Sequence, residues 1–373
     1  MRFRFFVFRL GLSSSEQPLT NHCLLKSDHS SALATLIAVT ACTLTMLFSA
    51  CSRPAEQVFE LSGSTMGTTY SVKITSIPDR LSLVMLSRLI DQRLARVNNL
   101  MSTYQPDSEL SRFNAQRSTD WFSVSPELVQ VIARAQAISE LSGGAFDVTV
   151  GPVVNLWGFG PDVTKPEVPD DRLIDSARAR IGYRMLEYRT SPAALRKARP
   201  DLYVDLSAIA KGYGVDQIAA ALEDNEIDAY LVEIGGELRG KGTKRHGKPW
   251  HVAIERPDPL ARSVYRVIQL SDAALATSGD YRNFFEDGGH LYSHTIDPQS
   301  GRPVEHGLAS VTVLSDDCTN ADALATALLV MGPERGFALA ESRDIAAFFV
   351  TRTTEGYANK ATPAFGRVLS PES

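Results

Sequence analysis

The order of strand-like and helix-like segments constrains the fold of this chain more than any other feature. Strands are expected at 58–61, 70–74, 202–206, 229–234, 251–255, 264–270, 310–314 and 346–350, with a hairpin turn at Asp287-Gly288-Gly289. Helical patterns cover 83–97, 126–142, 208–223 and, as two helices, 319–342. Because the two types come in segregated runs more than in strict alternation, we expect an α+β fold with a large, mainly antiparallel sheet and flanking helices.

The first fifty residues are a targeting segment by composition. Residues 31–50 are apolar or small throughout, basic residues precede them, and Cys51 with polar sequence follows. Since a cysteine after small residues resembles a bacterial lipoprotein processing box, we expect Cys51 to carry a lipid. Cys42 is a second candidate, but mostly apolar residues follow it where a solvated tether is expected. Alternatively, residues 31–50 stay uncut as one membrane-spanning helix.

Beyond Cys51, residues 51–57 are expected to form a tether and residues 58–373 the functional domain, without a low-complexity linker or a repeat. The formal net charge is -5, and no basic run is interleaved with aromatic residues, which excludes a nucleic-acid-binding surface. Of the four cysteines, only Cys318 lies beyond Cys51. An internal disulfide in the mature domain is therefore excluded.

The stretch CTNADALATALLVMG, residues 318–332, reads as a core helix with two oxygen side chains on one face. Asp322 and Thr326 are one helical turn apart, so their oxygens can reach one point in space. A carboxylate and a hydroxyl suit Mg²⁺ or Ca²⁺. The alternative is structural: Thr326 bonds back to the carbonyl four residues earlier, and Asp322 caps the helix start near Thr319.

Three further stretches carry candidate chemistry. Asp205 is expected at the end of a strand, and Lys211 follows in a helix of small residues, where it could meet a phosphate or simply extend from a packed helix. His294, beside an Ile-Asp-Pro turn, is a candidate general base or a structural histidine. The pair Gly235-Gly236 after a strand could cradle a phosphate, although a glycine pair is unspecific.

Seven blocks in register resemble the ApbE family of FAD:protein FMN transferases, and the resemblance covers essentially the whole chain after residue 57. The blocks are GSTMGTTY (63–70), MSTYQPDSELSRFN (101–114), GGAFDVTVGPVVNLWGFG (143–160), DLSAIAKGYGVD (205–216), EIGGELRGKG (233–242), TSGDYRNFFEDGGHLYSHTIDPQSGRP (277–303) and NADALATALLVMG (320–332). The resemblance implies an ApbE-like, T-fold-like architecture. It also implies an exported, lipid-anchored enzyme that moves FMN from FAD onto a Ser or Thr hydroxyl and releases AMP.

The same resemblance implies roles for individual residues. The FAD site would be lined by Met66, Tyr104, Ala145, Phe146, Asp147, Asp205, Lys211 and Ile296, with the rings of Tyr104 and Phe146 as stacking surfaces. Mg²⁺ would be held by Asp322, Thr326 and the backbone carbonyl of Ala208, where some relatives carry Thr. Ala325 replaces an acid of some relatives. His294 would act as the base, with Asp297 orienting its ring.

Three functions remain open at this point. The first is Mg²⁺-dependent FMN transfer to acceptor flavoproteins such as membrane redox-pump subunits, at the periplasmic side of the inner membrane. The second is hydrolysis of FAD to FMN and AMP at the same site, with water replacing the acceptor hydroxyl. The third is a non-catalytic flavin-binding lipoprotein, which would have no need for Asp322 with Thr326.

Overall fold

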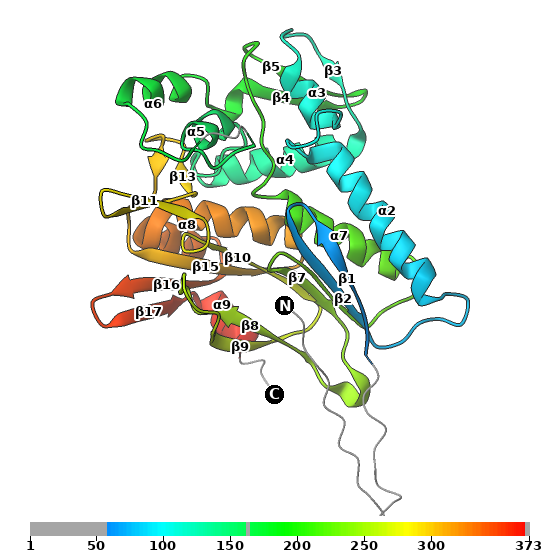
Figure 1. Ribbon diagram of the computed structural model, residues 1–373. Coiled ribbons are helices and arrows are strands. Elements are labelled where there is room, and N and C mark those ends of the chain that lie inside the picture. Colours follow the sequence, from blue (N-terminus) through cyan, green and yellow to red (C-terminus); the bar gives the residue numbers. More distant parts are fainter. Residues whose placement is uncertain (1–57, 162–164, 370–373) are drawn as a thin grey trace, which may run out of the picture. The chain divides into compact units, whose positions relative to one another are not determined.

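The structure, a computed structural model, describes residues 58–161 and 165–369 (Figure 1). The targeting segment, the tether and both candidate lipidation sites, Cys42 and Cys51, lie outside these residues. In the part of the chain that the structure describes, Cys318 is a free, buried cysteine.

An eight-stranded sheet forms the centre of the fold, in the order β1-β2-β6-β7-β10-β15-β16-β17. Every neighbouring pair in it is antiparallel, which confirms the expected large antiparallel sheet. The strands are β1 (Phe59–Thr65), β2 (Thr68–Ile74), β6 (Tyr230–Ile234), β7 (Glu237–Lys241), β10 (Ala273–Gly279), β15 (Leu308–Ser315), β16 (Ala346–Thr353) and β17 (Gly356–Ala361).

Three helices lie along one face of this sheet, and a small β unit covers part of the other (Figure 1). Apolar faces of α2 (Leu83–Met101) and α7 (Ala210–Glu223) pack with β2 and β6, and α8 (Cys318–Ser342) packs with β15 and β16. The opposite side chains of the strands pack on β8 (Trp250–Glu255), β9 (Val264–Leu270) and α9 (Pro363–Leu369). Strand alternation thus supplies a core on both faces.

A second layer of helices and short strands lies above α7 and α8 (Figure 1). It contains α3 (Glu109–Ala115), β3 (Phe122–Ser123), α4 (Pro126–Leu141), α5 (Gly151–Leu156), α6 (Asp171–Arg178), η2 (Tyr183–Met185), β4 (Leu186–Thr190) and β5 (Ala193–Lys197). Beside it lie two small hairpins, β11 (Phe284–Asp287) with β12 (His290–Ser293) and β13 (Ile296–Asp297) with β14 (Arg302–Pro303). The turn η3 (Arg245–Gly247) precedes β8.

Helix α8 has a break that the sequence pattern indicated. Gly332 has φ 83°, and Pro333 follows it, so two helical segments meet at this kink. Among the described helices, α8 alone is long and apolar enough to cross a membrane, but most of its apolar window is buried inside the protein. It is the core helix of the domain.

Residues 202–206 were expected to form a strand, and that expectation was wrong. The segment is extended but joins no sheet. The side chain of Asn114 pairs with both backbone groups of Val204, at 2.9 Å to its N–H and 2.8 Å to its carbonyl, and the Asp205 N–H bonds to the Val148 carbonyl at 2.7 Å. The apolar side chains of the segment are buried, so its strand-like pattern reflects burial without a ladder.

Candidate active site

The starts of α7 and α8 cross closely, and this crossing places Asp322. A Cβ at Gly212 would lie 2.2 Å from the Cys318 carbonyl oxygen and 2.8 Å from the Asp322 Cβ, so only glycine fits between the helices. The Gly212 N–H donates to Asp322 Oδ2 at 3.0 Å. Gly212 is the third residue of α7, and a helix start leaves the N–H at this position without a partner inside the helix. The first turn of α7 is therefore tied to the Asp322 carboxylate.

Two carboxylates share the ammonium of Lys211. Lys211 Nζ lies 2.8 Å from Glu237 Oε1 and 3.7 Å from Asp322 Oδ1, and both carboxylate side chains are almost fully buried. Burial acts to lower the pKa of Lys211, but the charges of Asp322 and Glu237 raise it by more, so the net pKa is above its ordinary value. Burial raises the pKa of Glu237, and Lys211 opposes that rise.

A two-residue turn brings Glu237 to this point. Ile234 pairs with Glu237 across the β6–β7 hairpin, and the turn residues Gly235 and Gly236 have φ of 63° and 108°. Such a turn needs positive φ at both positions, which glycine adopts without strain. The Gly236 N–H is taken by Glu233 Oε1 at 2.8 Å. The Gly235 N–H bonds to the Thr69 carbonyl at 3.0 Å, so the glycine pair serves as a hairpin turn and the structure does not support the possible phosphate cradle.

The oxygen donors near Asp322 fit a hard divalent cation. Thr326 follows Asp322 by one turn of α8, and its hydroxyl lies 2.9 Å from that of Ser278 at the end of β10. Glu237 Oε2 is buried and has no hydrogen-bond partner. Among the described residues no cluster of three or more His, Cys, Asp or Glu suits a metal. A set with few carboxylates is typical of Mg²⁺, which keeps waters and substrate phosphates as its other ligands.

The structural alternative for this helix is not what the structure shows. Asp317 caps α8, because its carboxylate accepts the Asn320 N–H at 2.8 Å. The Thr319 N–H is held by Asp216 of α7 at 2.9 Å. Asp322 therefore does not cap α8, and its carboxylate, which accepts the Gly212 N–H of α7, is in a side chain that is 2% exposed. The proposed third ligand, the Ala208 carbonyl, lies in the turn that precedes α7.

His294 is held by a backbone carbonyl. Its Nδ1 lies 3.0 Å from the Asn283 carbonyl oxygen, which can only accept, so Nδ1 carries the proton and Nε2 keeps its lone pair. Burial lowers the pKa of His294, and the charge of Lys211 lowers it further. Asp297 does not orient the ring as expected. Its carboxylate accepts the Gln299 N–H at 2.9 Å and caps the turn after β13.

Met66, Tyr104 and Asp205 lie where a ligand could meet them. Met66 has φ 50° in the turn between β1 and β2, and its side chain lies against Gly214 of α7. Tyr104 follows the end of α2 and is 68% exposed. Burial raises the pKa of Tyr104, and so does the nearby charge of Asp205. Asp205 uses one oxygen to accept the N–H and hydroxyl of Ser207, at 2.8 and 2.5 Å.

The Ala145-Phe146-Asp147 loop is built differently from expectation. The Phe146 ring is 2% exposed and belongs to the core cluster around α4, so it is not the stacking surface we expected. Asp147 accepts both the N–H and the hydroxyl of Thr149 and also the Tyr183 N–H, at 2.6 to 2.8 Å. These contacts shape the loop. Ala145 is buried beside them, and Ile296 packs in the cluster around Trp157.

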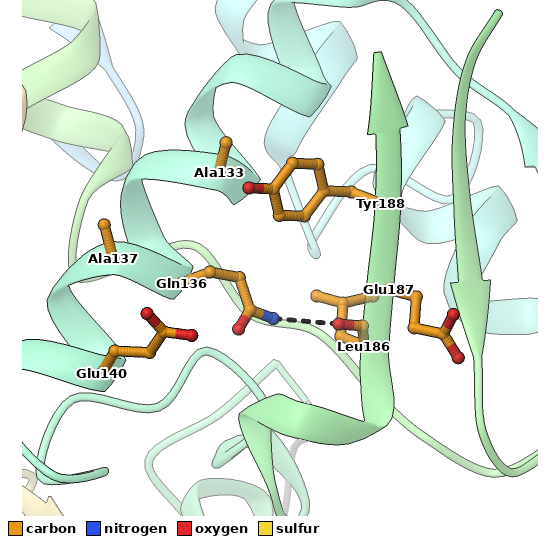
Figure 2. A pocket seen from close by; sticks show the side chains of 7 residues that line it. All are labelled: Ala133, Gln136, Ala137, Glu140, Leu186, Glu187 and Tyr188. Carbon is orange, nitrogen blue, oxygen red and sulfur yellow. Dashed lines mark hydrogen bonds between the residues drawn. The ribbon is translucent and has the colours of Figure 1, made fainter. Parts of the chain in front are cut away.

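A groove of about 340 Å³ lies between α4 and β4 (Figure 2). It contains none of the residues above. The Gln136 amide in it donates to the carbonyls of Tyr183 and Leu186 at 2.7 and 3.1 Å, which fixes β4 to α4. A second cavity, of about 230 Å³, lies between α4, α7 and the start of α8. We place the candidate site at the cluster of Lys211, Glu237 and Asp322, because buried charged groups meet there and the charge of Lys211 also acts on His294.

Sequence reasoning missed three residues of this site: Glu237, Ser278 and Asn283. Glu237 had a usable signal, since an acid directly after a Gly-Gly turn must lie at the start of the returning strand. Ser278 and Asn283 had none. A lone serine near a strand end and a residue that acts through its backbone carbonyl look ordinary in any sequence.

This chain is similar to known proteins over most of its length. The model of the ApbE family matches residues 66–349. A Vibrio cholerae protein named FAD:protein FMN transferase is 48% identical over 325 residues, covering 87% of this chain and 96% of the relative. A Haemophilus influenzae protein of the same name is 42% identical over 338 residues, covering 88% and 96%.

Solved structures show the same similarity. The flavin transferase ApbE from Vibrio cholerae superposes with a TM-score of 0.78 at 47% identity, over 84% of this chain and 99% of that one. The apo flavinyl transferase ApbE from Pseudomonas stutzeri gives 0.77 at 40% identity, over 85% and 98%. Because the family model, the sequence identity to these relatives and the shared fold all agree, the chain belongs to the ApbE family.

Proposed function

We propose that this protein is an FAD:protein FMN transferase that uses Mg²⁺, moves FMN from FAD onto a Ser or Thr hydroxyl of an acceptor protein and releases AMP. The observation that carries this proposal is the buried cluster of Lys211, Glu237 and Asp322. The charge of Lys211 lowers the pKa of His294 and so favours the neutral ring of this histidine. The names of the relatives supply the substrate.

The residues fit the chemistry of phosphoryl-group transfer to a hydroxyl. The acceptor oxygen attacks the phosphorus of the FMN half, and the bond from that phosphorus to the oxygen of AMP breaks. His294 Nε2 has the lone pair to take the hydroxyl proton. Lys211 offsets negative charge that develops on the phosphate oxygens. Mg²⁺ held by Asp322, Thr326 and the Ala208 carbonyl would supply further charge stabilisation there.

We further propose that the enzyme is anchored by a lipid on Cys51 at the periplasmic side of the inner membrane. The apolar run before Cys51 and the polar residues after it support this location. Exported flavoproteins, such as membrane redox-pump subunits, would then be within reach as acceptors. FAD is the substrate, and Met66, Tyr104 and Asp205 are the residues we expect it to contact.

The experiment that tests this function incubates the purified protein with FAD, Mg²⁺ and an acceptor domain that carries a Ser or Thr target. Mass spectrometry of the acceptor should show an FMN adduct, with AMP released in equal amount. Asp322→Ala should lose at least about 100-fold in rate because a cation ligand is gone. Asp317→Ala, which removes the cap of the same helix and an ion pair with Arg134 but no proposed cation ligand, should keep the rate. AMP without an adduct would contradict transfer and indicate FAD hydrolysis.

A further inference from the structure

Glu237 stands out because nothing in the reaction above uses it. It is 3% exposed at the start of β7, and one of its oxygens pairs with Lys211 Nζ at 2.8 Å. The other oxygen, Oε2, is buried without a hydrogen-bond partner. A buried carboxylate oxygen without a hydrogen-bond donor lowers the stability of the fold. A functional role would explain why Glu237 is placed there.

The two buried carboxylates do not share Lys211 equally. One ammonium, Lys211, faces two buried carboxylates, and it lies closer to Glu237, at 2.8 Å, than to Asp322, at 3.7 Å. The nearby Cys318 thiol stays neutral, because burial raises its pKa well above the ordinary value. Arg239 is taken by Asp216 at 2.8 Å. Asp322 therefore remains the carboxylate that is less closely paired with the ammonium.

This uneven sharing has a direct consequence for a cation at Asp322. A fully paired Asp322 would have its charge cancelled by Lys211, and a divalent cation would have to displace the ammonium. With Lys211 drawn to Glu237, the Asp322 carboxylate is less closely paired with the ammonium and more open to a cation. The hairpin turn at Gly235-Gly236 fixes Glu237 in the position that does this.

We propose, on the basis of the proposed function, that Glu237 is a positioning residue that holds the Lys211 ammonium away from Asp322 and so keeps this carboxylate available to Mg²⁺. Glu237 acts through Lys211 and does not itself bind the cation. Removing its carboxylate leaves Asp322 as the one buried carboxylate that pairs with Lys211 among the described residues. Mg²⁺ binding then weakens although every proposed ligand is still present.

The test measures Mg²⁺ binding by isothermal titration calorimetry to the purified protein, without acceptor. Glu237→Gln keeps the shape of the side chain and should weaken Mg²⁺ binding at least about tenfold, the scale of losses on mutating residues that support metal ligands. The double variant Glu237→Gln/Lys211→Met removes the competing ammonium and should recover most of the wild-type affinity. Glu223→Gln is the matched control: Glu223 is on the same helix as Lys211 but pairs with Tyr230, Arg239 and Lys241, so the variant should bind Mg²⁺ as the wild type does.

Each other outcome overturns the inference. Wild-type affinity in Glu237→Gln would show that the residue does not tune the cation site. Weak binding in both the single and double variants would make Glu237 a ligand or a purely structural residue. If the wild type itself does not bind Mg²⁺ with or without FAD, the metal part of the proposed function fails together with this inference. Retained FMN transfer with an unaffected Glu237→Gln would overturn the inference alone.

Discussion

At the scale of single residues, the chemistry of the site is set by hydrogen-bond partners more than by residue type. His294 is the clearest case. The Asn283 carbonyl holds the proton on Nδ1, and burial together with the Lys211 charge favours the uncharged ring. Because the pKa lies below the ordinary value of about 6.5, Nε2 is a free base at neutral pH.

Replacing His294 by Gln should lower the rate of FMN transfer by about 100-fold or more, because a positioned base contributes at least that much. In the wild type the rate should be full near pH 7 and fall as the pH drops below about 6.5, when the ring takes up a proton. The free energy of unfolding should also fall as the pH drops through this range. The pKa of His294 is lower in the folded protein than in the unfolded chain, so the unfolded chain takes up the proton first. The measurement is the transfer rate between about pH 5 and pH 8.

Two variants serve as controls for this prediction. His290→Gln changes an exposed histidine of the same hairpin and should leave the rate and its pH profile as they are. Asp297→Asn should keep the acid limb of the profile, because Asp297 caps a turn and does not contact the ring. A shifted acid limb in Asp297→Asn would restore the orienting role that the sequence suggested.

Some residues of the candidate site could be identified from the sequence, and others could not. Motif resemblance pointed to Lys211, Asp322 and His294, which the structure places around one charge cluster. It could not reveal that the Phe146 ring is in the core, because an aromatic residue beside a ligand and one beneath it look alike in sequence. Nor could it find Asn283, whose contribution is a backbone carbonyl.

At the scale of elements, the site depends on how closely α7 and α8 approach. Gly212 lies at their crossing, where the Cys318 carbonyl and Asp322 leave no room for a Cβ. The contact is between backbone and backbone, so a larger residue cannot be accommodated by turning a side chain. The helices themselves were predictable from their apolar spacing, but the crossing point was not.

Gly212→Ala should therefore lower the free energy of unfolding by about 1–3 kcal/mol, as overpacking does in a tight interior. It should also weaken Mg²⁺ binding, because α8 must move away and carry Asp322 with it. Urea denaturation and calorimetry measure the two effects. Gly366→Ala is the control: a Cβ there meets open space in α9, and the change should be neutral or stabilise by up to about 1 kcal/mol. Equal stability of the two variants would contradict the close crossing.

At the scale of the whole molecule, one sheet with helices on one face brings distant segments to a single site. The cluster joins residues from α7, β7, α8 and the loop after β12 (Figure 1). Apolar periodicity predicted α7 and α8 but not β7, and the segregated order of strands and helices predicted the antiparallel sheet. The periodicity failed at 202–206, where a buried extended segment bonds to Asn114 and Val148 and to no strand. Pairing of that kind depends on tertiary neighbours, which the local pattern does not contain.

The last prediction concerns how this molecule is held at a membrane. If Cys51 carries the lipid, Cys51→Ser in the full chain expressed in a bacterium should move the protein from the membrane to the soluble periplasmic fraction, whereas Cys42→Ser should leave it on the membrane. The reason is that acyl chains provide the anchor, at about 0.8 kcal/mol for each buried CH₂ group. Fractionation with lipid labelling measures both. Retention of unlabelled Cys51→Ser on the membrane would instead show that residues 31–50 remain as a spanning helix, which about 20 apolar residues suffice to form.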